Sequence, residues 1–320
     1  MPYKDRSGGL IAFGIMTILM GVLAGMFVPL MFFGHAMAAK TNHTPVDFSL
    51  ILPAVGIYGV MAVALVWLGI GSIKARRWAR ALMLIFSWSW LVMGVIAVTI
   101  MAFVLPKILA SIPSNATPGQ PAIPAEAMAA IMVFTFAFYG VVFIVLPAIW
   151  TFFYQSQHVR ITCETRDPIP CWTDACPLPV LGLCLWLLFA VPMLLLMPIS
   201  GHVVMPFFGM LLTGVPGAVF CLAMAALWTY AAWLFYRLNS NGWWLIFVAT
   251  CVFTVSSVST FARHDMLEMY QLMHYPKAQL EQIQLSGLLE GNRMSWLVSL
   301  SMLPFLGYLL FIRKFFRSGS

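Results

Sequence analysis

The stretch QSQHVRITCETRDPIPCWTDACPL, residues 155–178, decides how this chain is organised. It is a long polar segment between hydrophobic regions, and the regions on its two sides have a similar plan. We therefore expect residues 1–154 and 179–320 to form two halves, with 155–178 as the linker that joins them.

The composition of the chain is that of a membrane protein. Of its 320 residues, 62% are hydrophobic and 8% are charged, whereas a soluble domain carries roughly a quarter charged residues. The net charge of +7 does not indicate nucleic-acid binding, because the basic residues lie in short clusters beside apolar runs. This is the distribution that the positive-inside rule produces.

Eight apolar segments are long enough, or nearly so, to cross about 30 Å of hydrocarbon. Each half contains four of them, and Leu146-Pro147 in the fourth corresponds to Leu303-Pro304 in the eighth. The sequence therefore predicts an all-α integral membrane protein with eight transmembrane helices in two parallel four-helix pseudo-repeats. The expected spans are residues 10–33, 50–73, 81–105, 128–154, 180–200, 209–236, 243–261 and 294–312.

The basic residues indicate that both termini are cytoplasmic, because most of them then fall on the inner side. The inner segments would hold Lys4, Arg6, Lys74, Arg76, Arg77, Arg80, Arg160, Arg166, Arg237, Arg313, Lys314 and Arg317. The outer segments would hold Lys40, Lys107, Arg263, Lys277 and Arg293. We expect a multi-pass protein of the bacterial inner membrane, with the first apolar run retained as a helix because it is longer than a signal-peptide core.

The first span contains Gly21 and Gly25 in a G-x-x-x-G pattern, and Gly14 falls on the same helical face. Small residues at this spacing let a second helix approach closely. We expect a tight contact between helices of this chain, with a homodimer as the alternative.

A basic turn joins the second and third spans. It contains Lys74, Arg76, Arg77, Trp78 and Arg80, which would anchor the two helices in the lipid headgroups. Specific binding of anionic lipids is the alternative. The turn resembles that of small bacterial four-helix membrane modules with a basic R-x-W-A-type turn. The residues that carry this resemblance are Gly69, Gly71, Lys74, Arg77, Trp78, Ala79 and Arg80. It implies a bacterial inner-membrane location and no activity, and the second half departs from it.

The linker offers four side chains that could bind zinc, namely His158, Cys163, Cys171 and Cys176. Their spacing lacks the two close cysteine pairs of a structural zinc site. A compact linker that staples the two halves together is the preferred interpretation. In it, Trp172 would be buried against helix ends, and the acidic residues Glu164, Asp167 and Asp174 would pair with Arg160 and Arg166.

The last outer loop concentrates histidine and methionine, in His264, Met266, Met269, Met273 and His274. Thioether and imidazole groups suit Cu(I). The methionines, however, also follow the i, i+3, i+7 spacing of an amphipathic helix on the outer surface. We expect such a helical segment around residues 264–290, and copper binding stays open as a second hypothesis.

No Asp, Glu, Lys or Arg lies near the middle of any expected span, which disfavours proton-coupled transport. No phosphate-binding loop, H-E-x-x-H or G-x-S-x-G motif occurs. We therefore expect a non-enzymatic scaffold or accessory subunit without a cofactor, in contact with lipids and with a second copy or a partner membrane subunit.

Two other functions stay open. The first is a transporter or channel for an uncharged, lipophilic or metal substrate, which would need a cavity between the halves. That cavity would be lined by Thr250, Thr254, Ser257, Ser87 and Trp88. The second is an intramembrane enzyme, which would need titratable groups that converge at one edge, such as His202 with His264 and Asp265.

Overall fold

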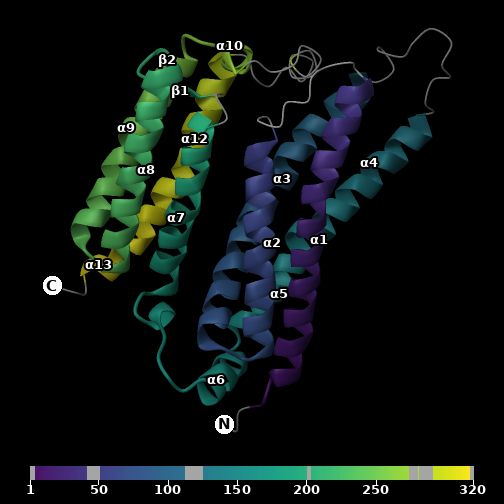
Figure 1. The fold of residues 1–320 in the computed structure, drawn as a ribbon, viewed down its shortest axis with the longest axis vertical. Helices are drawn as coiled ribbons and strands as arrows, with labels where there is room; N and C mark the ends of the chain where they lie inside the picture. Colours follow the sequence, from purple (N-terminus) through teal and green to yellow (C-terminus); the bar gives the residue numbers. More distant parts are fainter. Residues whose placement is uncertain are drawn as a thin grey trace.

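The computed structural model describes residues 4–41, 51–111, 125–199, 203–273, 280 and 291–317. Within these residues, eight helices are long and apolar enough to cross a membrane (Figure 1). The predicted set of apolar helices, four on each side of the linker, is thus confirmed. The chain has the form of a multi-pass membrane protein.

The first half consists of four antiparallel spans, of which the fourth is interrupted. Their helices are α1 (Ser7–Thr41), α2 (Leu52–Ile73), α3 (Arg77–Ser111), α4 (Ala125–Gly140), the π-helix η3 (Val141–Val145) and α5 (Leu146–Gln155). Helix α1 packs along α2, α2 contacts α3, and α3 packs against the fourth span. Each helix thus packs against its neighbour in sequence.

The linker forms helix α6 (Gln157–Arg166) and a single 3₁₀ turn, η4 (Trp172–Asp174). The second half follows with α7 (Leu178–Ile199), β1 (Val204–Phe207), β2 (Met210–Thr213), α8 (Gly214–Tyr236), α9 (Ser240–Phe261), α10 (Met266–Leu272), α12 (Gly291–Ile312) and α13 (Lys314–Arg317). Helix α7 packs along α8, α8 contacts α9, and α9 packs against α12, which is the neighbour order of the first half.

Each half has its own core, and both cores lie toward the end of the molecule that carries α6 and the two termini (Figure 1). We call this end the crossing end. In the first half, the buried Ser72 hydroxyl donates to the Leu10 carbonyl at 3.0 Å and lies 2.6 Å from the Tyr154 hydroxyl. In the second half, the indole N–H of Trp243 donates to the Leu309 carbonyl at 2.7 Å. These bonds satisfy polar groups that would otherwise be buried without a partner.

The fourth span changes direction at a π-helical turn just before Pro147. Proline has no N–H, so the carbonyl four residues earlier, that of Phe143, loses its helical donor. This carbonyl points at Gly94 of α3, where any Cβ would collide with it. Beyond the turn, α4 leans away from the rest of the first half (Figure 1). The proline and the glycine together explain where this span bends.

A β-hairpin connects α7 to α8, at a place where the sequence predicts a short turn followed by a span from residue 209. Strands β1 and β2 pair antiparallel, with Val204 opposite Thr213 and Phe207 opposite Met210. The start predicted for the sixth span is therefore wrong, because residues 210–213 are strand and α8 begins at Gly214. We call the end of the molecule that carries this hairpin the hairpin end.

The two halves meet along α7, which contacts both α2 and α3. Ile85 of α3 and Leu185 of α7 pack against both cores. Farther along the same helices, the indole N–H of Trp186 donates to the hydroxyl of Ser89 at 2.7 Å. Contact between the halves thus extends beyond the linker into the spans.

Candidate functional site

The small-residue face of α1 lies against α2. A Cβ on Gly21 would come within 3.0 Å of the Ala62 carbonyl, and one on Gly14 within 2.8 Å of the Gly69 carbonyl. Gly25 has more room, since its nearest neighbour is the Ala62 methyl at 3.5 Å. The close contact that the spacing predicts is therefore present within the chain, and α2 occupies the surface that a homodimer would have used.

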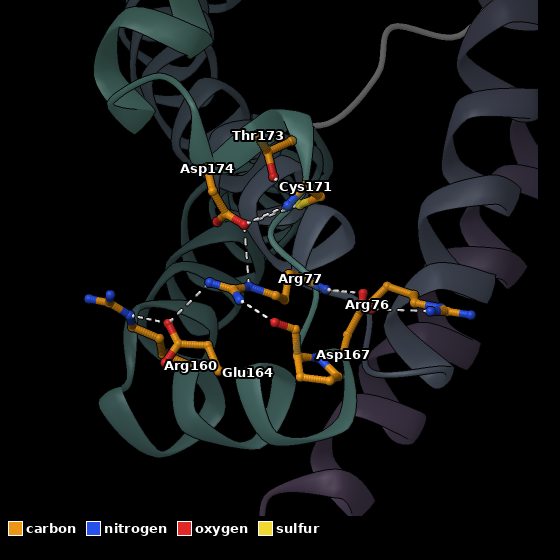
Figure 2. Close-up of polar contacts among 9 residues, drawn as sticks. Arg76, Arg77, Arg160, Glu164, Asp167, Cys171, Thr173 and Asp174 are labelled. Carbon is orange, nitrogen blue, oxygen red and sulfur yellow. Dashed lines mark hydrogen bonds and ion pairs between the residues drawn. The ribbon is translucent and has the colours of Figure 1, made fainter.

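The basic turn between α2 and α3 is held by the linker (Figure 2). The guanidinium of Arg77 lies 3.3 Å from the Asp174 carboxylate and 3.9 Å from that of Glu164. The Asp167 carboxylate accepts from the Arg76 guanidinium at 3.2 Å and from the Arg77 backbone N–H at 3.3 Å. This carboxylate is only 13% exposed, so its bonds are sheltered from water and stronger than surface ion pairs.

Two of the pairings that the sequence predicts for the linker acids are wrong. Glu164 does pair with Arg160, at 2.8 Å and one helical turn away. Asp167 and Asp174, in contrast, bind the basic turn, and Arg166 pairs with Asp5 near the N-terminus. Local spacing favours partners within the segment, whereas the fold brings α6 against α3 and so places other partners within reach.

The remaining residues of the basic turn have different environments. Lys74 is exposed, as an anchor in the headgroups would be. Trp78 stacks on Trp67 of α2 at 4.1 Å between ring centroids. Arg80 is half-buried, and its Nε has no hydrogen-bond partner among the described residues. This turn is therefore both a basic surface and part of the packing between helices.

The linker also contacts the second half. The hydroxyl of Tyr236, at the end of α8, donates to the Trp172 carbonyl at 3.1 Å, and Cys176 is buried in the core of the second half. Trp172 itself is 44% exposed, so the prediction that it is buried against helix ends is wrong. The linker therefore contacts both halves, as a segment that holds the two halves together must do.

The structure does not bring the four candidate zinc ligands together. Cys163 packs in the first core and Cys176 in the second, while Cys171 contacts Thr173 and Asp174. His158 accepts a hydrogen bond from the Lys4 backbone at 3.4 Å. In the described part of the chain, no three His, Cys, Asp or Glu side chains are placed to hold a metal ion. Burial raises the pKa of the Cys163 thiol to about 11, which disfavours the thiolate that zinc needs.

The hairpin turn is fastened to the end of α9. Phe208 and Gly209 both have positive φ, 43° and 84°, as a two-residue turn of type I′ requires. Their N–H groups donate to the hydroxyls of Ser256 at 2.9 Å and Thr260 at 3.0 Å. Because a left-handed conformation is costly for phenylalanine, these bonds are what keep the turn in place. The sequence analysis missed both hydroxyls, although Ser256 and Thr260 lie one helical turn apart.

His264, one of the candidate copper ligands, also contacts the hairpin turn. Its Nδ1 lies 2.9 Å from the Glu268 carboxylate and its Nε2 lies 3.2 Å from the Gly209 carbonyl. Both ring nitrogens thus already face oxygen atoms, so a copper ion would have to displace one of them.

The candidate methionine ligands lie on α10 and its C-terminal end. Met266, Met269 and Met273 are half-buried, whereas Glu268 and Gln271 are exposed. This alternation matches the amphipathic helix that the spacing predicts. His274 and most of the expected helical segment 264–290 beyond residue 273 lie outside the described residues.

An apolar groove of about 260 Å³ lies between α8 and α9, with the hairpin turn at one end. Its walls include Phe220 and Met224 of α8 and Ala249 and Val252 of α9. At the hairpin it is bounded by Phe207, Phe208 and Ser256. The sequence gives little indication of this groove, because its residues look like ordinary lipid-facing positions.

Two of the five side chains expected to line a transport pathway donate hydrogen bonds within their own helices. Thr254 donates to the Thr250 carbonyl at 2.7 Å, and Ser87 donates to the Leu84 carbonyl at 3.1 Å. Trp88 is 47% exposed. Ser257 is buried, and its hydroxyl has no hydrogen-bond partner among the described residues. None of the five lines the groove between α8 and α9.

Comparison of the chain with protein-family models, with curated proteins and with solved structures finds no match.

Proposed function

We propose that the protein is a non-enzymatic scaffold or accessory subunit of a membrane complex, and that α4 is the element that binds a partner membrane polypeptide. One observation carries the proposal. No residue in the most apolar stretch of the fourth span is buried within this chain, whereas every other span buries part of its apolar stretch.

The surface of α4 suits contact with another transmembrane helix. Phe134 is 71% exposed and stacks on Phe138 with 6.4 Å between ring centroids. Ile131 and Val133 are also exposed beside them. Association of helices in a bilayer depends on close van der Waals packing. A projecting helix with rigid aromatic side chains provides such packing on two sides.

The bend at η3 supports the same interpretation. Helix α5 packs against α3 next to the first core, and the direction changes only where Phe143 meets Gly94. A helix that served only to complete the bundle would gain contacts by continuing straight along α3. The bend costs part of this packing and leaves α4 free for a partner.

The location and internal symmetry form part of the proposal. The protein would lie in a bacterial inner membrane with the crossing end in the cytoplasm, since that end carries the basic turn and both chain termini. The two halves would be parallel repeats of a four-helix unit, a relation supported by their identical order of neighbouring helices.

Site-specific photo-crosslinking in the native membrane tests the proposal. A benzophenone amino acid is placed at Phe134 on α4 and, as a matched control, at Val63 on α2, which is 72% exposed. We expect position 134 to crosslink to a discrete polypeptide and position 63 to lipid alone. The mass of the product distinguishes a second copy of this chain from a different subunit. If both positions give only lipid adducts, α4 has no protein partner and the scaffold proposal fails.

A further inference from the structure

We propose that the groove between α8 and α9 binds an acyl chain of an anionic phospholipid, whose phosphate contacts Arg263 at the hairpin end. This inference concerns the second half and goes beyond the scaffold function. It does not depend on α4 or on any partner polypeptide.

The lining of the groove has the chemistry of an acyl-chain site. Apart from the Ser256 hydroxyl, the side chains around it are aliphatic, aromatic or thioether groups. The Ser256 hydroxyl already binds the hairpin, accepting from the Phe208 N–H and approaching the Pro206 carbonyl at 3.4 Å. The groove thus offers a hydrocarbon chain contact and offers a polar ligand almost no hydrogen bonds.

The length of the groove also suits an acyl chain. Along α9 the lining runs from Leu245 to Ser256, which at 1.5 Å per residue is about 16 Å. This is roughly half of the 30 Å hydrocarbon thickness, and so comparable to one leaflet. The lipid around the protein supplies chains of this length, oriented nearly along the helix.

The hairpin turn explains why such a chain would be held in place. Phe207 and Phe208 close the groove at the hairpin end, and their rings pack edge to face with 5.2 Å between centroids. The turn is bound to Ser256 and Thr260, and so its position relative to α9 is fixed. A chain beneath it would contact the aromatic rings as well as both helices.

Arg263 supplies a positive charge that complements the negative phosphate of the lipid. It lies two residues beyond the end of α9 at Phe261, on the side of the groove where Ser256 and the hairpin turn are. Its guanidinium lies against the hairpin turn, since a Cβ on Gly209 would come within 2.9 Å of its Nη1. Within the described residues no carboxylate lies at ion-pair distance from Arg263, whereas the nearby Glu268 is held by His264. A phosphate beside the turn would give Arg263 a partner.

Lipid titration followed by native mass spectrometry tests both parts of this site. The full-length protein is delipidated in detergent and titrated with phosphatidylglycerol or phosphatidylcholine that carry identical chains. We expect the wild type to bind phosphatidylglycerol about fivefold more tightly, the effect of one basic residue beside a headgroup with net negative charge. Both lipids carry a phosphate, but in phosphatidylcholine the choline group neutralises its charge. Arg263→Gln should abolish this preference, and Lys40→Gln, which removes an exposed charge from α1 at the same end, should preserve it.

The acyl-chain part is tested with residues of α9. Ala249→Phe fills the groove and should weaken binding of both lipids, whereas Val255→Phe adds a similar side chain at a 61% exposed position outside it. Ala249→Leu is the smaller replacement if the phenylalanine variant does not fold. Equal binding of the two lipids by the wild type, an undiminished preference in Arg263→Gln, or equal binding by the Ala249 and Val255 variants would overturn the proposal.

Discussion

At the scale of single residues, the charged side chains of the crossing end bind one another. The sequence predicts that Arg76 and Arg77 lie at the end of a span, because basic residues gather there. It does not predict their partners, since ion pairs depend on which segments the fold brings together. Asp167 thus binds a turn some ninety residues earlier in the chain. Local spacing revealed the Arg160–Glu164 pair and could not reveal the others.

The first prediction concerns the thiols of the linker. Burial raises the pKa of Cys163 to about 11, so only about one molecule in a thousand carries its thiolate at pH 8. Cys171 is partly exposed. Iodoacetamide at pH 8 should therefore modify Cys171 at least tenfold faster than Cys163, because the thiolate is the nucleophile. Peptide mapping measures both rates, and the two should become similar after unfolding in SDS. Equal rates in the folded protein would mean that Cys163 is not buried.

The second prediction concerns the sheltered carboxylate of Asp167. Asp167→Ala removes bonds to the Arg76 guanidinium and the Arg77 N–H and should cost about 1.5–3 kcal/mol of stability, the range for hydrogen bonds to charged groups. The matched control is Arg166→Ala, since Arg166 is 47% exposed and pairs with Asp5 at 3.4 Å. Exposed pairs contribute little. Thermal unfolding in detergent should show a lower melting temperature for the Asp167 variant alone, and equal melting temperatures would contradict the stapling role of the linker.

At the scale of elements, apolar runs predict where helices are, and they do not predict how helices bend or what connects them. The number of apolar helices and most of their boundaries follow from the length of the hydrophobic segments. The β-hairpin did not follow, because Val204–Thr213 is as apolar as a span and its turn depends on hydroxyls of α9. The bend in the fourth span was partly foreseeable from Pro147. Its location against Gly94 was not, because that contact joins two different helices.

The third prediction follows from this contact. In Gly94→Ala, the new methyl group would collide with the Phe143 carbonyl, so α3 and the fourth span would have to separate. Overpacking of this kind costs roughly 1–3 kcal/mol. Gly59→Ala is the control, because it places the same methyl group in open space on α2 and alanine favours the helix. A lower melting temperature is expected for the Gly94 variant only. If Gly94→Ala is as stable as the control, the approach of the two helices is looser than the structure indicates.

At the scale of the whole molecule, the polar segment 155–178 predicts the division into two halves. The structure adds that each half has a separate core at the crossing end and that the halves touch along α7. Neither property is visible in hydropathy, because lipid-facing and protein-facing residues are equally apolar in a membrane. The candidate sites were harder to foresee for the same reason. The groove between α8 and α9 differs from an ordinary lipid-facing surface only in shape.

The fourth prediction concerns which end of the molecule faces the cytoplasm. Both termini lie at the crossing end (Figure 1), together with the basic turn. Translocation is resisted by basic residues in short segments, so this end should face the cytoplasm. In a bacterial host, alkaline phosphatase fused after Thr41 or Ser111, where α1 and α3 reach the hairpin end, should be active. The same enzyme fused after residue 320 should be inactive, and a fluorescent protein there should fluoresce. Phosphatase activity at residue 320 would mean that the orientation is the opposite of the predicted one. The phospholipid site near Arg263 would then lie in the cytoplasmic leaflet, where anionic lipids are abundant.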